Sequence, residues 1–139
     1  MLHNRLLEII ASHTELLDKL RSRGINWNDL VDLYAVLHVL QVHAQAMIDY
    51  LLHTCALMGI SAETPIHCID ELGRSGFITQ GDAELLRRVV RFRNLVVHEY
   101  GAIDVVRVRG IVESRGYAMV LGIIRNLHDR LRSMGVVDP

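Results

Sequence analysis

Apolar residues recur every three or four positions along most of the chain, which is the spacing that places them on one face of an α-helix. The first such run predicts a helix over residues 3–22. Gly24 favours an end there, because glycine takes the left-handed cap conformation at little cost. Asn28 followed by Asp29 predicts the N-terminal cap of a long second helix, which we expect to end at Gly59.

The same pattern predicts shorter helices in the second half of the chain. Thr64 followed by Pro65 is typical of a helix start, because threonine caps free N–H groups and proline fits the first turn. This third helix is expected to end at Gly73 or Gly76. Residues 79–82 resemble a capping box and predict the start of a fourth helix.

Two more helices are expected before the C-terminus. The fourth helix continues into residues 91–100 until Gly101 breaks it, and Asp104 is a candidate cap for a short fifth helix. A final helix over about residues 114–134 would direct four apolar side chains inward: Met119, Ile123, Leu127 and Leu131. Three glycines leave the boundary between the last two helices open: Gly110, Gly116 and Gly122.

The composition agrees with a helical core. Half of the 139 residues are hydrophobic but only 5% are aromatic, so the core consists mainly of leucine, valine, isoleucine, alanine and methionine. A β-sandwich would use more aromatic and β-branched residues. The length suits one domain with a sizeable core. The sequence therefore predicts a single all-α domain over residues 1–139, a bundle of about five to six helices.

The most apolar segment, residues 33–52, is interrupted by polar side chains at His38, Gln41, His43, Gln45 and Asp49. A membrane-spanning helix needs about 20 predominantly apolar residues, so we expect no membrane span. The first residues also lack the long apolar core of a signal peptide. A cytoplasmic location is therefore expected.

The two cysteines, Cys55 and Cys68, have no spacing typical of a metal or redox site, which favours a reducing cytosol. Together with His53 and His67 they make four side chains of the zinc-binding type. The spacing of these four fits no usual zinc motif, and adjacent ligands on one helix restrict a tetrahedral approach. We expect the cysteines to pack in the core, with no metal and no cofactor.

Polar side chains form a stripe along the second helix, because they follow one another by three or four residues: His38, Gln41, Gln45, Asp49 and His53. A stripe of this kind on an apolar helix is either its solvent side or one wall of a polar cleft. The pattern alone leaves both possibilities open.

Charge is spread unevenly although the whole chain carries a formal charge of only −1. Residues 1–70 hold four basic and eight acidic side chains, while residues 71–139 hold eleven basic and eight acidic ones. Arginine suits phosphate recognition through its planar and permanently charged guanidinium group. A solvated basic face is the alternative. The candidate RNA-binding residues in this region are Arg87, Arg88, Arg91, Arg107 and Arg109.

Residues 91–100 contain more reactive side chains than any other stretch of this length. At about 100° per residue, Asn94 and His98 share one helix face, so the amide could hold the imidazole in one tautomer. Arg93 and His98 would lie about 140° apart on a continuous helix. Either the helix ends near Val97, or the arginine and histidine meet counterparts across a symmetric dimer.

A cleft holding arginine and histidine would suit RNA. The arginine can neutralise the scissile phosphate, and the histidine can take a proton from a 2′-hydroxyl or give one to the leaving oxygen, without a metal. Taken singly, His98 could equally be an ordinary core or surface histidine, and Tyr100 a packing residue at a helix end.

The pattern Arg93-x-x-x-x-His98-x-Tyr100, with Asn94 after the arginine and Val97 before the histidine, resembles the signature of HepT toxins in the HEPN superfamily. The likeness covers most of the chain. Further segments resemble the family: Ile48-Asp49 with His53, Leu72-Gly73 with Phe77-Ile78, and Gly101-Ala102-Ile103-Asp104. The family's Phe-x-x-x-Gly spacing is absent.

The resemblance implies a homodimeric ribonuclease toxin with a HEPN-like fold, in which Arg93 and His98 are catalytic and Asn94 and Asp49 are supporting residues. It also implies a partner, an MntA-like minimal nucleotidyltransferase antitoxin, in a pair of the type VII class. Such a partner inactivates the toxin by attaching AMP to the motif tyrosine, here Tyr100. Toxin and antitoxin could form a higher assembly.

Two other functions remain compatible with the sequence. A non-catalytic helical protein could present a substrate to a separate nucleotidyltransferase. A helical dimer could also have a structural role alone, although that would leave the arginines unexplained. The set Arg93, His98 and Tyr100 favours the enzyme.

Overall fold

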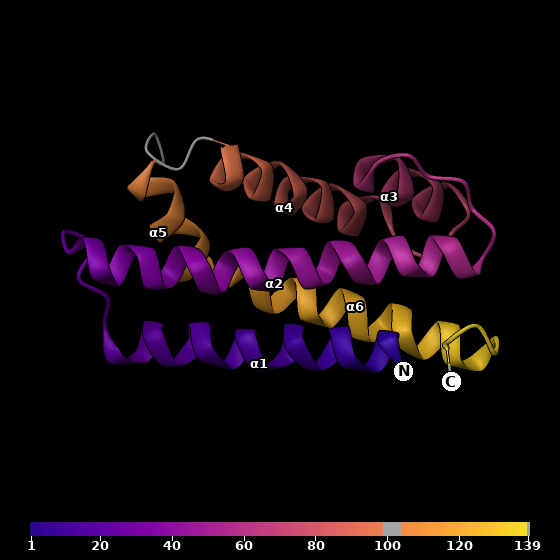
Figure 1. The fold of residues 1–139 in the computed structure, drawn as a ribbon, viewed down its shortest axis with the longest axis horizontal. Helices are drawn as coiled ribbons and strands as arrows, with labels where there is room; N and C mark the ends of the chain where they lie inside the picture. The colour runs from indigo at the N-terminus through magenta and orange to yellow at the C-terminus, as the bar shows by residue number, and fades with distance from the viewer. Residues whose placement is uncertain (99–103, 139) are drawn as a thin grey trace.

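The computed structural model describes residues 1–98 and 104–138. These residues form six helices and no strand, which confirms the predicted all-α fold. Helices α1 (Leu2–Arg23) and α2 (Leu30–Leu57) form a long antiparallel hairpin, and α4 (Gln80–His98) lies on the opposite side of α2 (Figure 1). Helix α2 is therefore the central element of the bundle.

Three helices complete the bundle. The short α3 (Pro65–Arg74) contacts α2 and α4, and α6 (Gly116–Ser133) contacts α1, α2 and α4. Helix α5 (Val105–Ser114) lies at one end of the molecule, close to the end of α4, whereas both chain termini lie at the other end (Figure 1). The end of α4 and the chain termini therefore lie at opposite ends of the bundle.

Side-chain caps fix the helix starts where the sequence predicted them. Asp29 accepts a hydrogen bond from the Val31 N–H (2.9 Å) at the start of α2, and Thr64 accepts one from the His67 N–H (3.1 Å) at the start of α3. Asp104 accepts one from Val106 (3.0 Å) at the start of α5. These bonds satisfy N–H groups that have no partner within the helix.

Helix α3 ends at Arg74, and Gly76 then takes the left-handed conformation, with φ of 81°, which confirms the second of the two expected stop positions. One detail of α6 differs from the prediction. Met119 was predicted to face inward, and this prediction is wrong, because its side chain is 55% exposed. The inward face of α6 is set by Val120, Ile124 and Leu127, and one residue along a helix turns the side chain by about 100°.

Helix α2 is long and apolar enough to cross a membrane by length and composition, but half of its most apolar window is buried inside this fold. The core helix of a soluble bundle has the same composition. Its buried side chains, such as Leu37, Met47 and Leu51, join the apolar faces of the neighbouring helices into two clusters of core residues. The buried half of this window therefore lies in the core of the bundle.

Cys55 in α2 and Cys68 in α3 are bonded as a disulfide, 13 residues apart in sequence. Both residues are buried in the core, as expected, whereas the bond between them was not predicted. Packing of α3 against α2 brings the two sulfurs together, and no spacing rule could have revealed this. The bond ties the short α3 to the central helix.

The junction between α5 and α6 is held against α1 by Arg115. This residue has a positive φ of 55°, which is uncommon for a residue with a side chain. Its guanidinium group donates two hydrogen bonds to the Asp18 carboxylate (3.0 and 2.9 Å), and the Tyr117 hydroxyl donates a third (2.7 Å). These bonds, Arg115 first, hold the pKa of Asp18 below its usual value.

Candidate ribonuclease site

Helix α4 carries the residues of the Arg93–Tyr100 motif. The Thr79 hydroxyl accepts a hydrogen bond from the Asp82 N–H (3.1 Å) at its start, as a capping residue does, and the helix then continues without a break through His98. Buried Leu86, Val90 and Val96 lie on its inward side. Helix α4 is described through His98, and the break predicted at Gly101 lies outside the described residues.

Arg93 lies on the inward side of α4, among apolar residues. Residues three and four apart along a helix are neighbours, and those around Arg93 are Val89, Val90 and Val96. Its Nε is buried and has no hydrogen-bond partner among the described residues. An unpaired buried donor costs about 1–3 kcal/mol, so this atom favours a ligand with acceptor oxygens, such as a phosphate.

Asn94 is exposed and lies about 40° from the position of His98 around the helix. The backbone of His98 is helical, but its side chain and the whole of Tyr100 lie outside the described residues. On an unbroken helix the backbone positions of Arg93 and His98 lie about 140° apart around the axis. The two positions therefore lie on different sides of α4.

The five arginines of the basic region have different surroundings. Arg87 is mostly buried and paired with Asp70 (2.8 Å) and Glu84 (3.2 Å), so it stabilises the contact between α3 and α4. Arg88 and Arg91 are exposed and make only long contacts with Glu84, at 3.5 and 3.9 Å.

On α5, Arg109 pairs with Glu113 at 3.0 Å, and Arg107 is exposed. The pair on Arg109 lies one helical turn apart on the surface, where water competes with both charges, so it holds the guanidinium group only weakly. Arg88, Arg91 and Arg107 are the arginines best placed to meet a ligand from solution.

The polar stripe of α2 lies largely on the solvent side. His38 and Asp49 are exposed, and the Gln45 amide donates a hydrogen bond to the Asp49 carboxylate (2.9 Å). His53, at the end of the stripe, is partly buried and contacts the Asp138 carboxylate (3.0 Å). The stripe therefore divides into a solvent-facing part and one histidine that belongs to a buried polar cluster.

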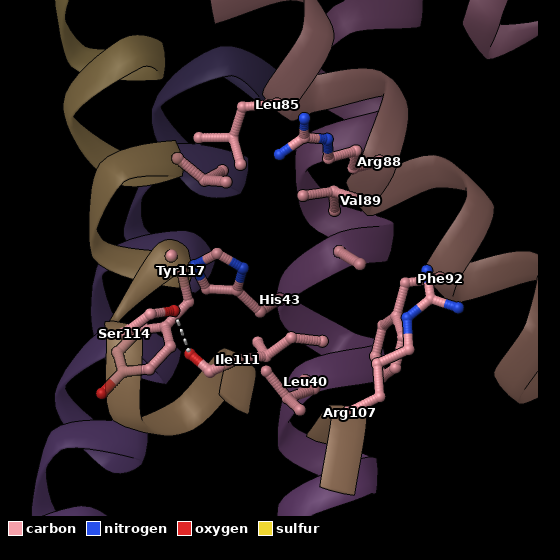
Figure 2. A pocket seen from close by; sticks show the side chains of 13 residues that line it. Leu40, His43, Leu85, Arg88, Val89, Phe92, Arg107, Ile111, Ser114 and Tyr117 are labelled. Atoms are coloured by element: carbon pink, nitrogen blue, oxygen red, sulfur yellow. Dashed lines mark hydrogen bonds between the residues drawn. The ribbon is translucent and has the colours of Figure 1, made fainter. Parts of the chain in front are cut away.

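A cavity of about 250 Å³ lies between α2, α4, α5 and α6. Figure 2 shows His43 and Tyr117 on one side of it, and Phe92 and Arg107 on the other. Its walls are mainly apolar, and the guanidinium groups of Arg88 and Arg107 are its charged components. Such a cavity can take an aromatic ring while the arginines hold an attached phosphate.

Two titratable residues of this cavity were not singled out from the sequence. Burial lowers the pKa of His43 to about 4, so the imidazole is neutral near pH 7, and its Nε2 contacts the Thr14 hydroxyl (3.1 Å). Burial and the bond to Asp18 raise the pKa of Tyr117 to about 12. Neither shift was predictable, because both depend on helices that lie far apart in sequence.

A family model described as "Ribonuclease HepT-like" matches residues 6–121, which is most of the chain. The chain belongs to the HepT-like family. A comparison with curated proteins found no match. The HepT-like assignment agrees with the resemblance carried by Arg93, His98 and Tyr100.

Solved structures show the same fold at low sequence identity. A tri-AMPylated HEPN toxin from Shewanella oneidensis, solved in complex with an MNT antitoxin, matches with a TM-score of 0.79 and 19% identity over 89% of this chain and 96% of that one. A mutant MntA–HpeT toxin–antitoxin complex matches with a TM-score of 0.77 and 19% identity, over 89% of this chain and 97% of that one. YutE from Bacillus subtilis, a cytosolic protein of unknown function, matches with a TM-score of 0.78 and 12% identity, over 99% of this chain and 93% of that one.

The glycines that left the last two helices uncertain are accommodated in this HepT-like chain. Gly110 lies inside α5, and Gly116 is the first residue of α6. A Cβ placed at Gly110 would meet nothing within 4 Å. Neither glycine interrupts the HepT-like fold, and α5 remains beside the end of α4, where the motif lies.

Proposed function

We propose that this HepT-like chain is the toxin of a toxin–antitoxin pair and acts as a metal-independent endoribonuclease. The observation that carries the proposal is the buried Nε of Arg93, which has no partner among the described residues and lies on the same helix as His98. A phosphate oxygen would satisfy this donor, and the guanidinium charge would offset the negative charge that develops during cleavage.

The reaction we propose is attack by a ribose 2′-oxygen on the adjacent phosphorus. His98 takes the proton of the 2′-hydroxyl, and the 2′-oxygen forms a bond to phosphorus. The bond from phosphorus to the 5′-oxygen breaks, and that oxygen receives a proton from the His98 imidazolium formed in the first step. The products are a 2′,3′-cyclic phosphate and a 5′-hydroxyl, so no oxidant, reductant or metal is required.

We propose that the active form is a symmetric dimer. The directions of Arg93 and His98 differ by about 140° within one α4 helix, and a two-fold axis beside that helix would place Arg93 of one copy near His98 of the other. The exposed Arg88, Arg91 and Arg107 would contact the RNA backbone outside this cleft.

The proposed control is adenylylation of Tyr100 by an MntA-like nucleotidyltransferase. The similar toxins were solved with MNT antitoxins, and one of them is tri-AMPylated. Tyr100 follows His98 by two residues, so attached AMP would bring a negative phosphate and a bulky base to the site. Both toxin and antitoxin would act in the cytoplasm, where RNA and ATP are available.

Cleavage of a labelled single-stranded RNA by the purified chain, with EDTA present, tests the proposed activity. Arg93→Ala and His98→Ala should each lower the rate by about 10²–10³-fold, because each removes a group that acts in the transition state. Arg125→Ala, an exposed arginine on α6, is the matched control and should keep the rate. Equal cleavage by all four proteins would exclude the proposed site. Binding of a nucleotidyltransferase without cleavage would favour the non-catalytic partner.

A further inference from the structure

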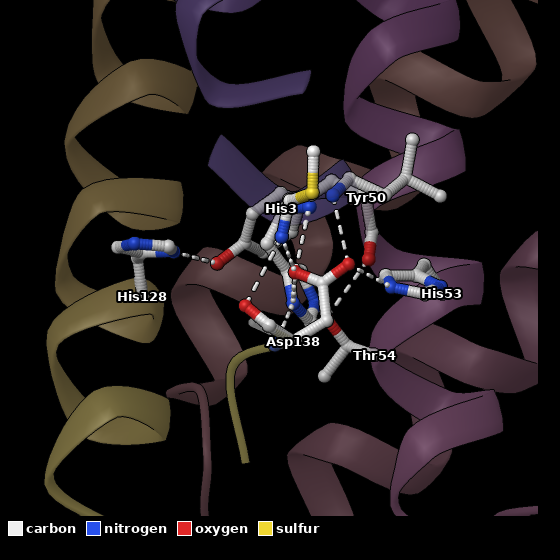
Figure 3. A network of polar contacts seen from close by, with 8 residues as sticks. His3, Tyr50, His53, Thr54, His128 and Asp138 are labelled. Carbon is white, nitrogen blue, oxygen red and sulfur yellow. Dashed lines mark hydrogen bonds and ion pairs between the residues drawn. The ribbon is translucent and has the colours of Figure 1, made fainter. Parts of the chain in front are cut away.

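A cluster of polar side chains lies at the end of the bundle opposite to α5, where both termini meet α2. His3 in α1, His53 in α2 and Asp138 in the C-terminal segment each direct one potential metal-ligand atom into it, and these atoms lie within 4.8 Å of one another. Figure 3 shows the Asp138 carboxylate linked to both histidines. The three residues come from opposite ends of the chain and from its centre.

Hydrogen bonds fix the tautomer of His3. The Thr54 hydroxyl donates to the Tyr50 carbonyl (2.8 Å), so its oxygen accepts from the His3 Nε2 (2.9 Å). The proton of the ring is therefore on Nε2, and the lone pair of Nδ1 points toward the Asp138 carboxylate at 3.4 Å. Among the described residues, the donor that faces this lone pair is the Asp138 N–H, at a long 3.4 Å.

The His3 Nδ1 and the Asp138 carboxylate oxygen that faces it are both electron-pair donors. The His3 ring is completely buried, and its proton lies on Nε2, so its Nδ1 offers a lone pair. The Asp138 carboxylate offers the oxygens that face the two imidazoles. A lone pair facing a carboxylate oxygen is the arrangement that a cation between them would stabilise.

The three ligand atoms lie within 4.8 Å of one another, so a small inward shift of the side chains would bring them to the edges of a tetrahedral zinc site. Zinc–ligand bonds of about 2.0–2.1 Å place neighbouring ligand atoms about 3.3 Å apart. The His53 Nε2 is 3.0 Å from one oxygen of Asp138, and the His3 Nδ1 is 3.4 Å from the other. Metal-binding histidines usually donate their second N–H to a protein group, as His3 does to Thr54.

Asp138 also caps α1, since its carboxylate accepts from the Leu2 N–H (2.7 Å) and the His3 N–H (3.2 Å). Capping explains the position of the carboxylate but not the orientation of the two imidazoles toward it. The Met1 ammonium group lies 2.8 Å from Oδ1 at the exposed edge of the cluster, and a divalent ion would replace that contact.

We propose that His3, His53 and Asp138 bind a divalent transition-metal ion of the zinc class, with a water molecule as the fourth ligand. The ion would fasten the C-terminal segment to α1 and α2. It would lie at the other end of the bundle from α5, so its role would be structural and separate from RNA cleavage (Figure 1).

The test uses the full chain without an affinity tag, freed of metal with a chelator and then titrated with Zn²⁺. We expect one equivalent to bind and to raise the unfolding temperature by roughly 5–10 °C at a hundredfold excess over Kd. Co²⁺ in the same protein should give the intense visible absorption of a tetrahedral site, and Mg²⁺ should give no shift.

His53→Gln and Asp138→Asn should each weaken Zn²⁺ binding by at least about 100-fold. Both variants keep a hydrogen-bonding side chain, and His53 is partly exposed, so folding should be retained and is checked by circular dichroism. His67→Gln, at an exposed histidine, is the matched control and should bind like the wild type. Unchanged Zn²⁺ affinity in both variants, or no stoichiometric binding to the wild type, would overturn the proposal.

Discussion

Arg93 and His98 lie five residues apart on one unbroken helix, so their backbone positions lie about 140° apart around the axis of α4. Arg93 is partly buried, and its buried Nε has no hydrogen-bond partner among the described residues. Asn94, one turn before His98, is exposed. This relationship is the physical reason for proposing a site shared between two copies of the chain.

Arg87 and Arg88 are adjacent but should behave differently when replaced. Arg87→Gln loses ion pairs with Asp70 and Glu84, and should lower the free energy of unfolding by about 1 kcal/mol. Arg88→Gln should leave stability unchanged but weaken RNA binding several-fold. It should also make the slope of log binding constant against log salt concentration shallower by about 0.7, the value for one phosphate contact on a single strand. Urea unfolding and RNA titrations at several salt concentrations measure the two effects. Equal effects of both changes on stability would contradict the assigned roles.

Stability should fall as the pH falls from 7 toward 4. The folded pKa of His43 is about 4 and its unfolded pKa about 6.5, so the unfolded state binds more protons between these values. The difference corresponds to about 3 kcal/mol. His3 and His128 also have pKa values lowered mainly by burial, and they act in the same direction.

His43→Gln should reduce the slope of unfolding free energy against pH, measured by urea unfolding between pH 7 and 4.5. His38→Gln, at an exposed position on the same helix, serves as the control and should keep the wild-type slope. An unchanged slope in His43→Gln would show that this histidine is not the titrating group.

The disulfide should make the protein sensitive to reductant. A closed loop of this length contributes about 3 kcal/mol, so reduction should lower the urea midpoint markedly. A Cys55→Ala, Cys68→Ala double variant should be indifferent to reductant. Two titratable thiols in protein purified and unfolded without reductant would contradict the bond.

Adenylylation should occur on Tyr100 and nowhere else. The chain co-expressed with its cognate nucleotidyltransferase should gain one or more AMP masses and lose RNA cleavage, while Tyr100→Phe should gain none and remain toxic. Tyr34→Phe, at an exposed tyrosine of α2, is the control and should be modified normally. Modification of the Tyr100→Phe chain would contradict this control mechanism.

Local chemistry made much of the fold predictable. Asp29, Thr64 and Asp104 all cap the helices they were expected to cap, because a capping bond spans only two or three residues. Met119 was misplaced because the inward direction of α6 is set by its neighbours in space rather than by helical spacing alone.

The contacts that sequence analysis missed join distant parts of the chain. His3 and Asp138 are separated by 135 residues, and the cysteines meet only because α3 packs on α2. The burial of Arg93 was also not predictable, since its motif suggested a reactive group without showing which side of α4 faces the core.

Mixing two inactive variants tests the shared site most directly. Arg93→Ala and His98→Ala proteins would be combined under conditions that exchange subunits, and cleavage of a labelled RNA would be measured against each variant alone. If Arg93 of one copy acts with His98 of the other, each mixed dimer has one intact site and about half the wild-type activity. Cleavage that stays at the level of either variant alone, with mixed dimers confirmed by mass, would contradict a site built across the dimer.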